Sequence, residues 1–139
     1  MNEPAKQAPV GIDLGTTFSV IAYLNNNGRP ESVPNAEGDL LTHSVVLFDD
    51  QEVIVGKEAA KAMASELSLV AECPKRQIGQ RVFDKQILGR RYPPEALQGW
   101  ILRKLKLDAM RTVGEFDQAV ITVPAYFDEV RRKATQDSG

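Results

Sequence analysis

The stretch Val10-Gly11-Ile12-Asp13-Leu14-Gly15-Thr16-Thr17-Phe18 decides how this chain is interpreted. Apolar residues typical of a strand lead up to Asp13, and a second such run extends from Phe18 to Leu24. The pattern predicts two strands joined by a tight hairpin. The segment Asp13-Leu14-Gly15-Thr16-Thr17 lies at its tip, with a carboxylate at the end of the first strand.

The residues of this tip are suited to binding phosphate. Gly15 permits a tight turn and a close approach of backbone to a ligand, and successive N–H groups in such a turn can bind an anion. Thr16 and Thr17 add hydroxyl donors. Asp13 can hold a hydrated Mg²⁺, which binds one or two carboxylates together with water and phosphate oxygens. The turn therefore predicts a nucleotide site.

An ordinary hairpin is the alternative interpretation, because Asp, Gly and Thr are common turn residues. Neither of the two standard phosphate motifs, G-x-x-x-x-G-K-[ST] and G-x-G-x-x-G, occurs in the chain. A nucleotide site in this protein has to be built on the hairpin turn.

Composition limits the function further. The chain has 139 residues, enough for one domain, with 42% hydrophobic and 26% charged residues, as in ordinary globular proteins. A net charge of −2 and sparse aromatic residues argue against nucleic-acid or anionic-membrane partners. The single Cys73 excludes an internal disulfide, and the single His43 excludes a multi-histidine metal site. With no signal-peptide pattern and no apolar run of membrane-spanning length, we expect a cytoplasmic protein.

Strand and turn signals continue after the first hairpin. Residues 1–8 are expected to be disordered. Turns are predicted at Asn25-Asn26-Asn27-Gly28 and at Asn35-Ala36-Glu37-Gly38-Asp39. Further strands are predicted at residues 31–33, 44–48 and 52–55, which together with the hairpin would make an antiparallel meander.

Helical signals dominate the second half. A helix is predicted around residues 59–64, and a longer one begins at Pro93-Pro94 with Leu97, Ile101, Leu105 and Ala109 as its buried stripe. Residues 119–123 form a continuous apolar run, typical of a buried strand. Asp128 is placed to cap a last helix.

Four stretches in order resemble the seventy-kilodalton heat-shock chaperones, the DnaK type. They are the segment from Val10 to Thr17, Pro34-Asn35-Ala36-Glu37-Gly38-Asp39, Lys75-Arg76-Gln77-Ile78-Gly79, and Val120-Ile121-Thr122-Val123-Pro124-Ala125-Tyr126-Phe127 followed by Arg132-Lys133-Ala134-Thr135. The resemblance implies an α/β fold of the actin-like, ribonuclease-H-like type. Residues 9–139 would be part of the first lobe, a mixed sheet with flanking helices, truncated at its carboxyl end.

The same resemblance implies a role for individual residues. Asp13 would hold Mg²⁺ through water, while Gly15, Thr16 and Thr17 would bind the phosphates of ATP or ADP. Lys75 would be the catalytic residue that positions the attacking water. Pro124 and Arg132 would be allosteric residues that report the nucleotide state. The whole protein would be an ATPase that couples nucleotide state to the binding of unfolded peptide clients, together with co-chaperones.

The sequence departs from the family pattern at several positions. Phe18 stands where asparagine is usual, His43 where proline is usual, and Pro74 where an aliphatic residue is usual, so the approach of Lys75 could differ. The second phosphate loop, the adenosine site, the second lobe and the peptide-binding domain would all follow Gly139. We therefore expect this chain alone not to hydrolyse ATP at a useful rate. A sugar-kinase-like phosphotransferase and an actin-like filament protein are alternatives that use the same turn.

Overall fold

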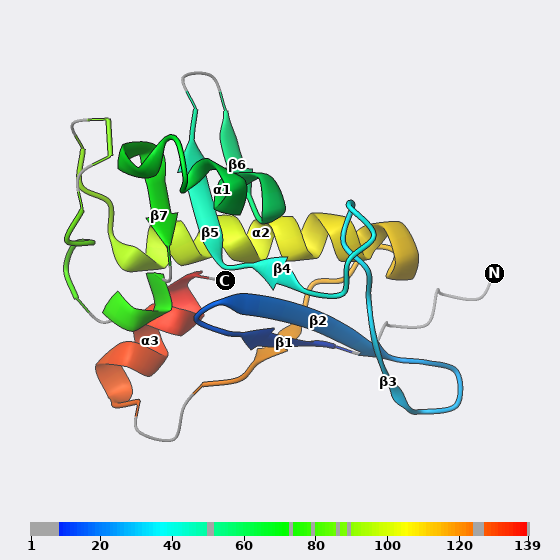
Figure 1. Cartoon of the computed structure of the whole chain (residues 1–139). Helices are drawn as coiled ribbons and strands as arrows, with labels where there is room; N and C mark the ends of the chain where they lie inside the picture. Colours follow the sequence, from blue (N-terminus) through cyan, green and yellow to red (C-terminus); the bar gives the residue numbers. More distant parts are fainter. Residues whose placement is uncertain are drawn as a thin grey trace.

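The fold combines two β-sheets with three α-helices among the residues that the structure describes (Figure 1). The structure is a computed structural model that describes residues 9–49, 52–72, 74–78, 80–85, 87–88, 90–123 and 127–138. The larger sheet contains β1 (Val10–Leu14), β2 (Phe18–Leu24), β3 (Pro30–Ser32), β4 (Thr42–His43) and β8 (Ala119–Ile121). The smaller contains β5 (Val45–Phe48), β6 (Val53–Val55) and β7 (Val70–Glu72). The helices are α1 (Lys57–Ala62), α2 (Pro94–Val113) and α3 (Glu129–Ser138), with short 3₁₀ turns η1 (Leu67–Leu69) and η2 (Pro74–Gln77).

The larger sheet is mixed. Strands β1 and β2 form the predicted antiparallel hairpin, with Leu14 opposite Ser19 at its tip. On its other side β1 pairs in parallel with β8, with Ile12 opposite Ile121. The expected combination of a mixed sheet and flanking helices is confirmed.

The expected single meander is wrong, because the strands divide between two sheets. Strand β2 has seven residues, long enough to pair with β3 through residues 22–24 and with β4 through residues 18–19. Strand β5 then begins the second sheet, where it pairs with β6 as expected and also with β7. The three residues of β7 were not predicted as a strand, since so short a run carries little periodicity.

Helix α2 joins the two sheets. It begins with Pro94 in the first turn, as predicted, and its stripe of Leu97, Ile101, Leu105 and Ala109 is buried. The stripe belongs to one apolar cluster that includes residues of both sheets, and in Figure 1 the helix crosses the molecule between them. The position of the larger sheet relative to the smaller one therefore depends on this helix.

The expectation of a buried strand at residues 119–123 needs correction. The strand β8 is present, but Val120 is 64% exposed. Val120 points away from the face that carries Ala119 and Ile121, and β8 pairs only with β1 among the described strands, so neither a packed face nor a second neighbouring strand covers it. An apolar run identifies a strand without showing whether both of its faces are covered.

Two asparagine turns share one geometry. In the first, the Oδ1 atom of Asn25 accepts from the N–H of Asn27 and of Arg29, at 2.9 and 3.1 Å. In the second, Oδ1 of Asn35 accepts from residues 37 and 39, at 3.1 and 2.9 Å. Gly28 and Gly38 occupy the same place in each turn with φ of 73° and 86°, which favours glycine. Both predicted turns are confirmed.

Asp128 caps α3 as predicted, because its Oδ1 accepts from the N–H of Arg131 at 2.9 Å. The described part of the chain has no helix of the length and apolarity that a membrane crossing requires. The predicted disorder of residues 1–8 falls outside the described residues.

Candidate functional site

The phosphate turn, residues 15–17, lies at the tip of the β1–β2 hairpin. A Cβ atom built on Gly15 would lie 2.1 Å from the backbone oxygen of Phe18, a separation that real structures do not tolerate. Only glycine therefore fits this backbone path. Thr16 and Thr17 are both exposed at the tip, where their hydroxyl groups can meet a ligand.

Asp13 lies next to this turn on the exposed side of β1. Its Oδ1 atom accepts a hydrogen bond from Oγ1 of Thr122 at 3.1 Å, and the Thr122 N–H donates to the Ile12 oxygen at 3.0 Å. Strands β1 and β8 are parallel, so their carboxyl ends meet at one edge of the sheet, the usual place for ligands in α/β proteins. Thr122 was not predicted as a site residue, because the sequence does not indicate which strand lies beside β1.

Two buried serines are linked to the turn by hydrogen bonds. Oγ of Ser44 donates to the Gly15 oxygen at 2.9 Å, and the N–H of Ser44 donates to the Thr17 oxygen at 2.9 Å. Oγ of Ser19 lies 2.9 Å from Oγ of Ser44. Ser19 and Ser44 are 0% and 1% exposed. Sequence reasoning missed both, since serine near strands is ordinary.

Two departures from the family pattern contact each other beside the turn. Phe18 on β2 is paired with His43 on β4, and their ring centroids are 4.6 Å apart at an angle of 48°. The aromatic pair thus closes one flank of the hairpin at the point where β4 joins it. Along the chain His43 lies between Thr42 and Ser44, both of which are buried.

Lys75 lies on η2, which packs against α2. Pro74 is the first residue of η2 and is buried, so it begins this turn. The Lys75 residue itself is half-buried, and no hydrogen bond or ion pair between described residues joins it to Asp13. Its predicted place beside the phosphate turn stays a prediction.

Of the two predicted allosteric residues, Arg132 is among the described residues and Pro124 is not. Arg132 lies on α3, and its Nε donates to the Phe127 oxygen at 3.2 Å. Pro124 lies outside the described residues, as does Cys73.

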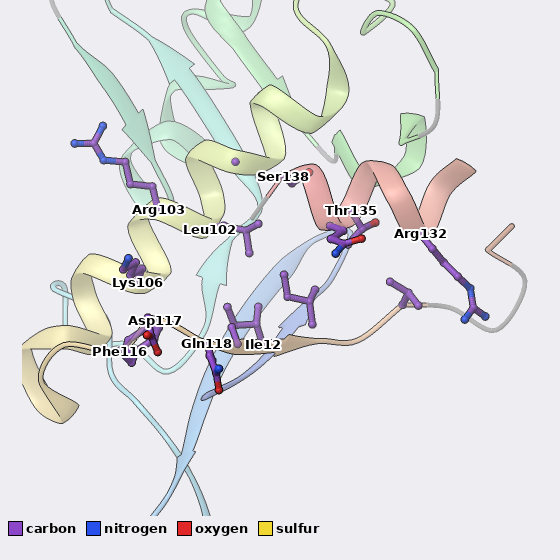
Figure 2. Close-up of a pocket in the computed structure, with 15 residues that line it drawn as sticks. Ile12, Leu102, Arg103, Lys106, Phe116, Asp117, Gln118, Arg132, Thr135 and Ser138 are labelled. Atoms are coloured by element: carbon purple, nitrogen blue, oxygen red, sulfur yellow. The ribbon is translucent and has the colours of Figure 1, made fainter. Parts of the chain in front are cut away.

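A cavity in the described part of the chain lies apart from the phosphate turn. It has a volume of about 650 Å³ and lies between α2, α3 and one face of β1 and β8 (Figure 2). Arg103 and Lys106 lie at one end and Arg132 at the other. Ile12 lines this cavity, whereas Asp13, the next residue of β1, is directed to the opposite face by the alternation of the strand.

Metal binding by protein ligands alone finds no support among the described residues, where no group of three or more His, Cys, Asp or Glu side chains is arranged to hold an ion. Asp13 is thus a single carboxylate beside the turn that is predicted to bind phosphate. Such an arrangement fits Mg²⁺, which keeps several waters and takes its remaining ligands from phosphate.

A partly buried ion cluster fixes the second asparagine turn to α2. Nζ of Lys104 donates to Oε1 and Oε2 of Glu37, at 3.0 and 3.1 Å, and to Oδ2 of Asp108 at 2.8 Å. Burial alone would lower the pKa of Lys104, but the hydrogen bonds to Asp108 and Glu37 oppose it, and the pKa is raised. The same turn is tied to β4, because Nδ2 of Asn35 donates to Oγ1 of Thr42 at 3.1 Å.

Comparison with known proteins identifies the family of this chain. The family model described as Hsp70 protein matches residues 9–89 and 80–139. The chain is 42% identical to the chaperone protein DnaK of Thermotoga neapolitana over 140 residues, which cover 96% of this chain and 23% of the relative. It is 38% identical to the chaperone protein DnaK of Halobacterium salinarum, over 97% of this chain and 22% of the relative. The chain thus spans less than a quarter of the length of these relatives, and the matches cover nearly all of it: the chain belongs to the Hsp70 family.

Proposed function

We propose that this chain is the amino-terminal part of the ATP-binding and ATP-hydrolysing domain of a heat-shock chaperone. Residues 9–139 would form part of the first lobe of an actin-like fold, which the mixed sheet and its helices support. Family membership and the names of the relatives favour a chaperone over the sugar-kinase-like and filament-forming alternatives.

The observation that carries this proposal is the backbone of the phosphate turn. Only glycine fits at position 15, between β1 and β2. Thr16 and Thr17 of the same turn are exposed to solvent. We propose that the backbone and hydroxyl groups of residues 15–17 bind the β- and γ-phosphates of ATP or the phosphates of ADP. Backbone N–H groups held in a turn are effective phosphate donors because no reorganisation is needed when the ligand binds.

Asp13 is the residue that would hold Mg²⁺ through water. Its carboxylate is exposed and oriented by Thr122, so its position is fixed while it stays accessible. The metal would supply neutralisation of phosphate charge. The contribution of Asp13 is to bind and orient the hydrated ion at the edge of the sheet.

We further propose that Lys75 positions the attacking water near the γ-phosphate and stabilises charge that develops there. In the protein at its natural length, Lys75→Ala is expected to leave ATP binding nearly intact and to remove most of the hydrolysis. Single-turnover measurements with ATP test this, with Lys61→Ala, which removes an exposed lysine of α1, as the control. Hydrolysis by Lys75→Ala at the rate of the control would reject the catalytic role.

The whole protein would couple nucleotide state to the binding of unfolded peptide segments in the cytoplasm, with co-chaperones as further partners. Pro124 and Arg132 would transmit that state. A chain of residues 1–139 alone is expected not to hydrolyse ATP at a useful rate. Turnover by it at the rate of a complete ATPase would contradict this division of roles.

Calorimetric titration of the protein with ADP and Mg²⁺ tests the nucleotide site directly. Asp13→Asn should weaken binding in the presence of Mg²⁺ and reduce the difference between titrations with and without the metal. Asp137→Asn is the matched control, because it removes an equal charge from an exposed ion pair on α3. Equal ADP affinities for the two variants would reject the assignment of Asp13, and no binding of ADP by the unaltered protein would reject the nucleotide site as a whole.

A further inference from the structure

We propose that Ser44 is a positioning residue for phosphate binding, acting through a hydrogen-bond relay from Ser19 to the Gly15 carbonyl. The inference rests on the proposed nucleotide site and assigns a role to residues that do not touch the ligand. Ser44 contacts both ends of the phosphate turn at once, through Gly15 and through Thr17.

The direction of the relay follows from counting protons. A serine hydroxyl has one proton to donate, and that of Ser44 is given to the Gly15 oxygen at 2.9 Å. The contact of 2.9 Å between the two hydroxyl groups must then have Ser19 as donor and Ser44 as acceptor. The relay thus runs one way, from Ser19 through Ser44 to Gly15, and its serines are excluded from water.

The relay sets the orientation of the peptide group between Gly15 and Thr16. In a trans peptide the carbonyl and the N–H point in opposite directions, and the described chain has no cis peptide bond. Since the Gly15 oxygen is directed to the buried Ser44, the Thr16 N–H of the same peptide group is directed away from Ser44. Hydrogen bonds in a chain also polarise one another, so donation to this carbonyl makes the Thr16 N–H a better donor to an anion.

The backbone N–H of Ser44 acts on the other side of the turn. It donates to the Thr17 oxygen at 2.9 Å and so holds the beginning of β2 against β4. Without the Ser44 side chain this backbone bond would remain, and the fold of β4 with it. The loss would fall on the Gly15–Thr16 peptide, which belongs to the turn that we propose binds phosphate.

The experiment compares ADP with adenosine, which lacks phosphate, by calorimetric titration of the protein at its natural length. Loss of one buried hydrogen bond to a backbone carbonyl is expected to weaken ADP binding by Ser44→Ala about tenfold, with adenosine affinity unchanged. Ser19→Ala removes the first link and leaves the bond to Gly15, so about a twofold loss is expected. If the serines had only a structural role, the variants would lose affinity for ADP and for adenosine to the same extent.

A second pair of variants distinguishes the effect of the Ser44 hydroxyl group from the effect of side-chain volume. Ser44→Thr and Ser44→Val add side chains of the same shape, but only threonine keeps the hydroxyl. Ser44→Thr is expected to bind ADP about tenfold more tightly than Ser44→Val, and this comparison decides the matter if Ser44→Ala does not fold. Equal ADP affinities for the pair would overturn the role of Ser44 while leaving the nucleotide site intact. Failure of the unaltered protein to prefer ADP to adenosine would instead overturn the phosphate site.

Discussion

Replacing Lys104 with methionine should destabilise the protein far more than the same change at Lys133. Lys104 pairs with Asp108, and Lys133 with Asp137, at the same spacing of four residues and the same distance of 2.8 Å. The two pairs differ in burial: side-chain exposure is 14% and 11% in the first, and 70% and 51% in the second. Methionine keeps most of the apolar stem and removes the charge.

The expected loss in the free energy of unfolding depends on the carboxylates that Lys104→Met leaves without a partner. Truncating one partner of a buried ion pair costs about 3–5 kcal/mol, because the other charge stays buried without a partner. Lys104→Met leaves one buried carboxylate without its partner, that of Asp108, whereas 30% of the Glu37 side chain is accessible and water can solvate its charge. We therefore expect about 2–3 kcal/mol for Lys104→Met and at most about 0.5 kcal/mol for Lys133→Met.

Urea unfolding at pH 7 measures both variants. With a slope of about 1–3 kcal/mol per molar, the midpoint for Lys104→Met should fall by about 1–2 M and that for Lys133→Met should hardly move. Equal midpoints for the two variants would refute the argument that burial decides the strength of these pairs. A changed slope would show instead that the unfolded or folded state had altered.

The pH dependence of this difference has a definite sign. Hydrogen bonds to Asp108 and Glu37 raise the pKa of Lys104 in the folded protein. The stabilisation is therefore complete below the pKa of lysine in the unfolded chain, about 10.4, and it is lost as pH rises through the folded pKa. The gap in stability between the unaltered protein and Lys104→Met should stay constant near neutral pH and shrink only in strongly alkaline solution.

Two further substitutions have matched controls within the chain. Gly15→Ala should abolish ADP binding in calorimetric titrations, because its Cβ would collide with the backbone oxygen of Phe18. Gly11→Ala, on the preceding strand β1, meets no atom within 4 Å and should bind ADP normally. Normal ADP binding by both variants would show that the turn adapts. Asn35→Ala should lower the free energy of unfolding by about 1 kcal/mol more than Asn25→Ala. Nδ2 of Asn35 donates to Leu41 and Thr42 at 3.3 and 3.1 Å, whereas Nδ2 of Asn25 makes one long, exposed bond of 3.5 Å to Glu31. Equal losses in urea unfolding would show that the extra bonds add nothing.

Local signals in the sequence were sufficient for part of the fold. The β1–β2 hairpin, both asparagine turns and the buried stripe of α2 were predicted correctly, because each depends on residues within a few positions of one another. The same holds for Gly15, whose need for glycine arises within its own turn.

The remainder depends on pairing between distant segments. Asp13 and Thr122 are 109 residues apart, and Ser44 reaches Gly15 across 29 residues. No local pattern indicates that β8 lies beside β1 or that β4 returns to β2. The ion pair between Lys104 and Asp108 could not be recognised as partly buried from the sequence, because a lysine and an aspartate four residues apart are common on exposed helix surfaces. Its burial depends on Gly56 and Glu37, which lie against Lys104 in the fold.

The distance along the chain between Asp13 and Thr122 also sets an order of events during synthesis. At about 5–20 residues per second, roughly 5–20 s separate the emergence of the two residues from the ribosome. The hairpin can form during that interval, but the side of β1 that later receives β8 has no partner. An unpaired strand edge is a template for association with other chains. The nascent protein therefore passes through a stage in which its own sheet is open to misassembly, and the parallel pairing that completes the Asp13 edge also ends that exposure.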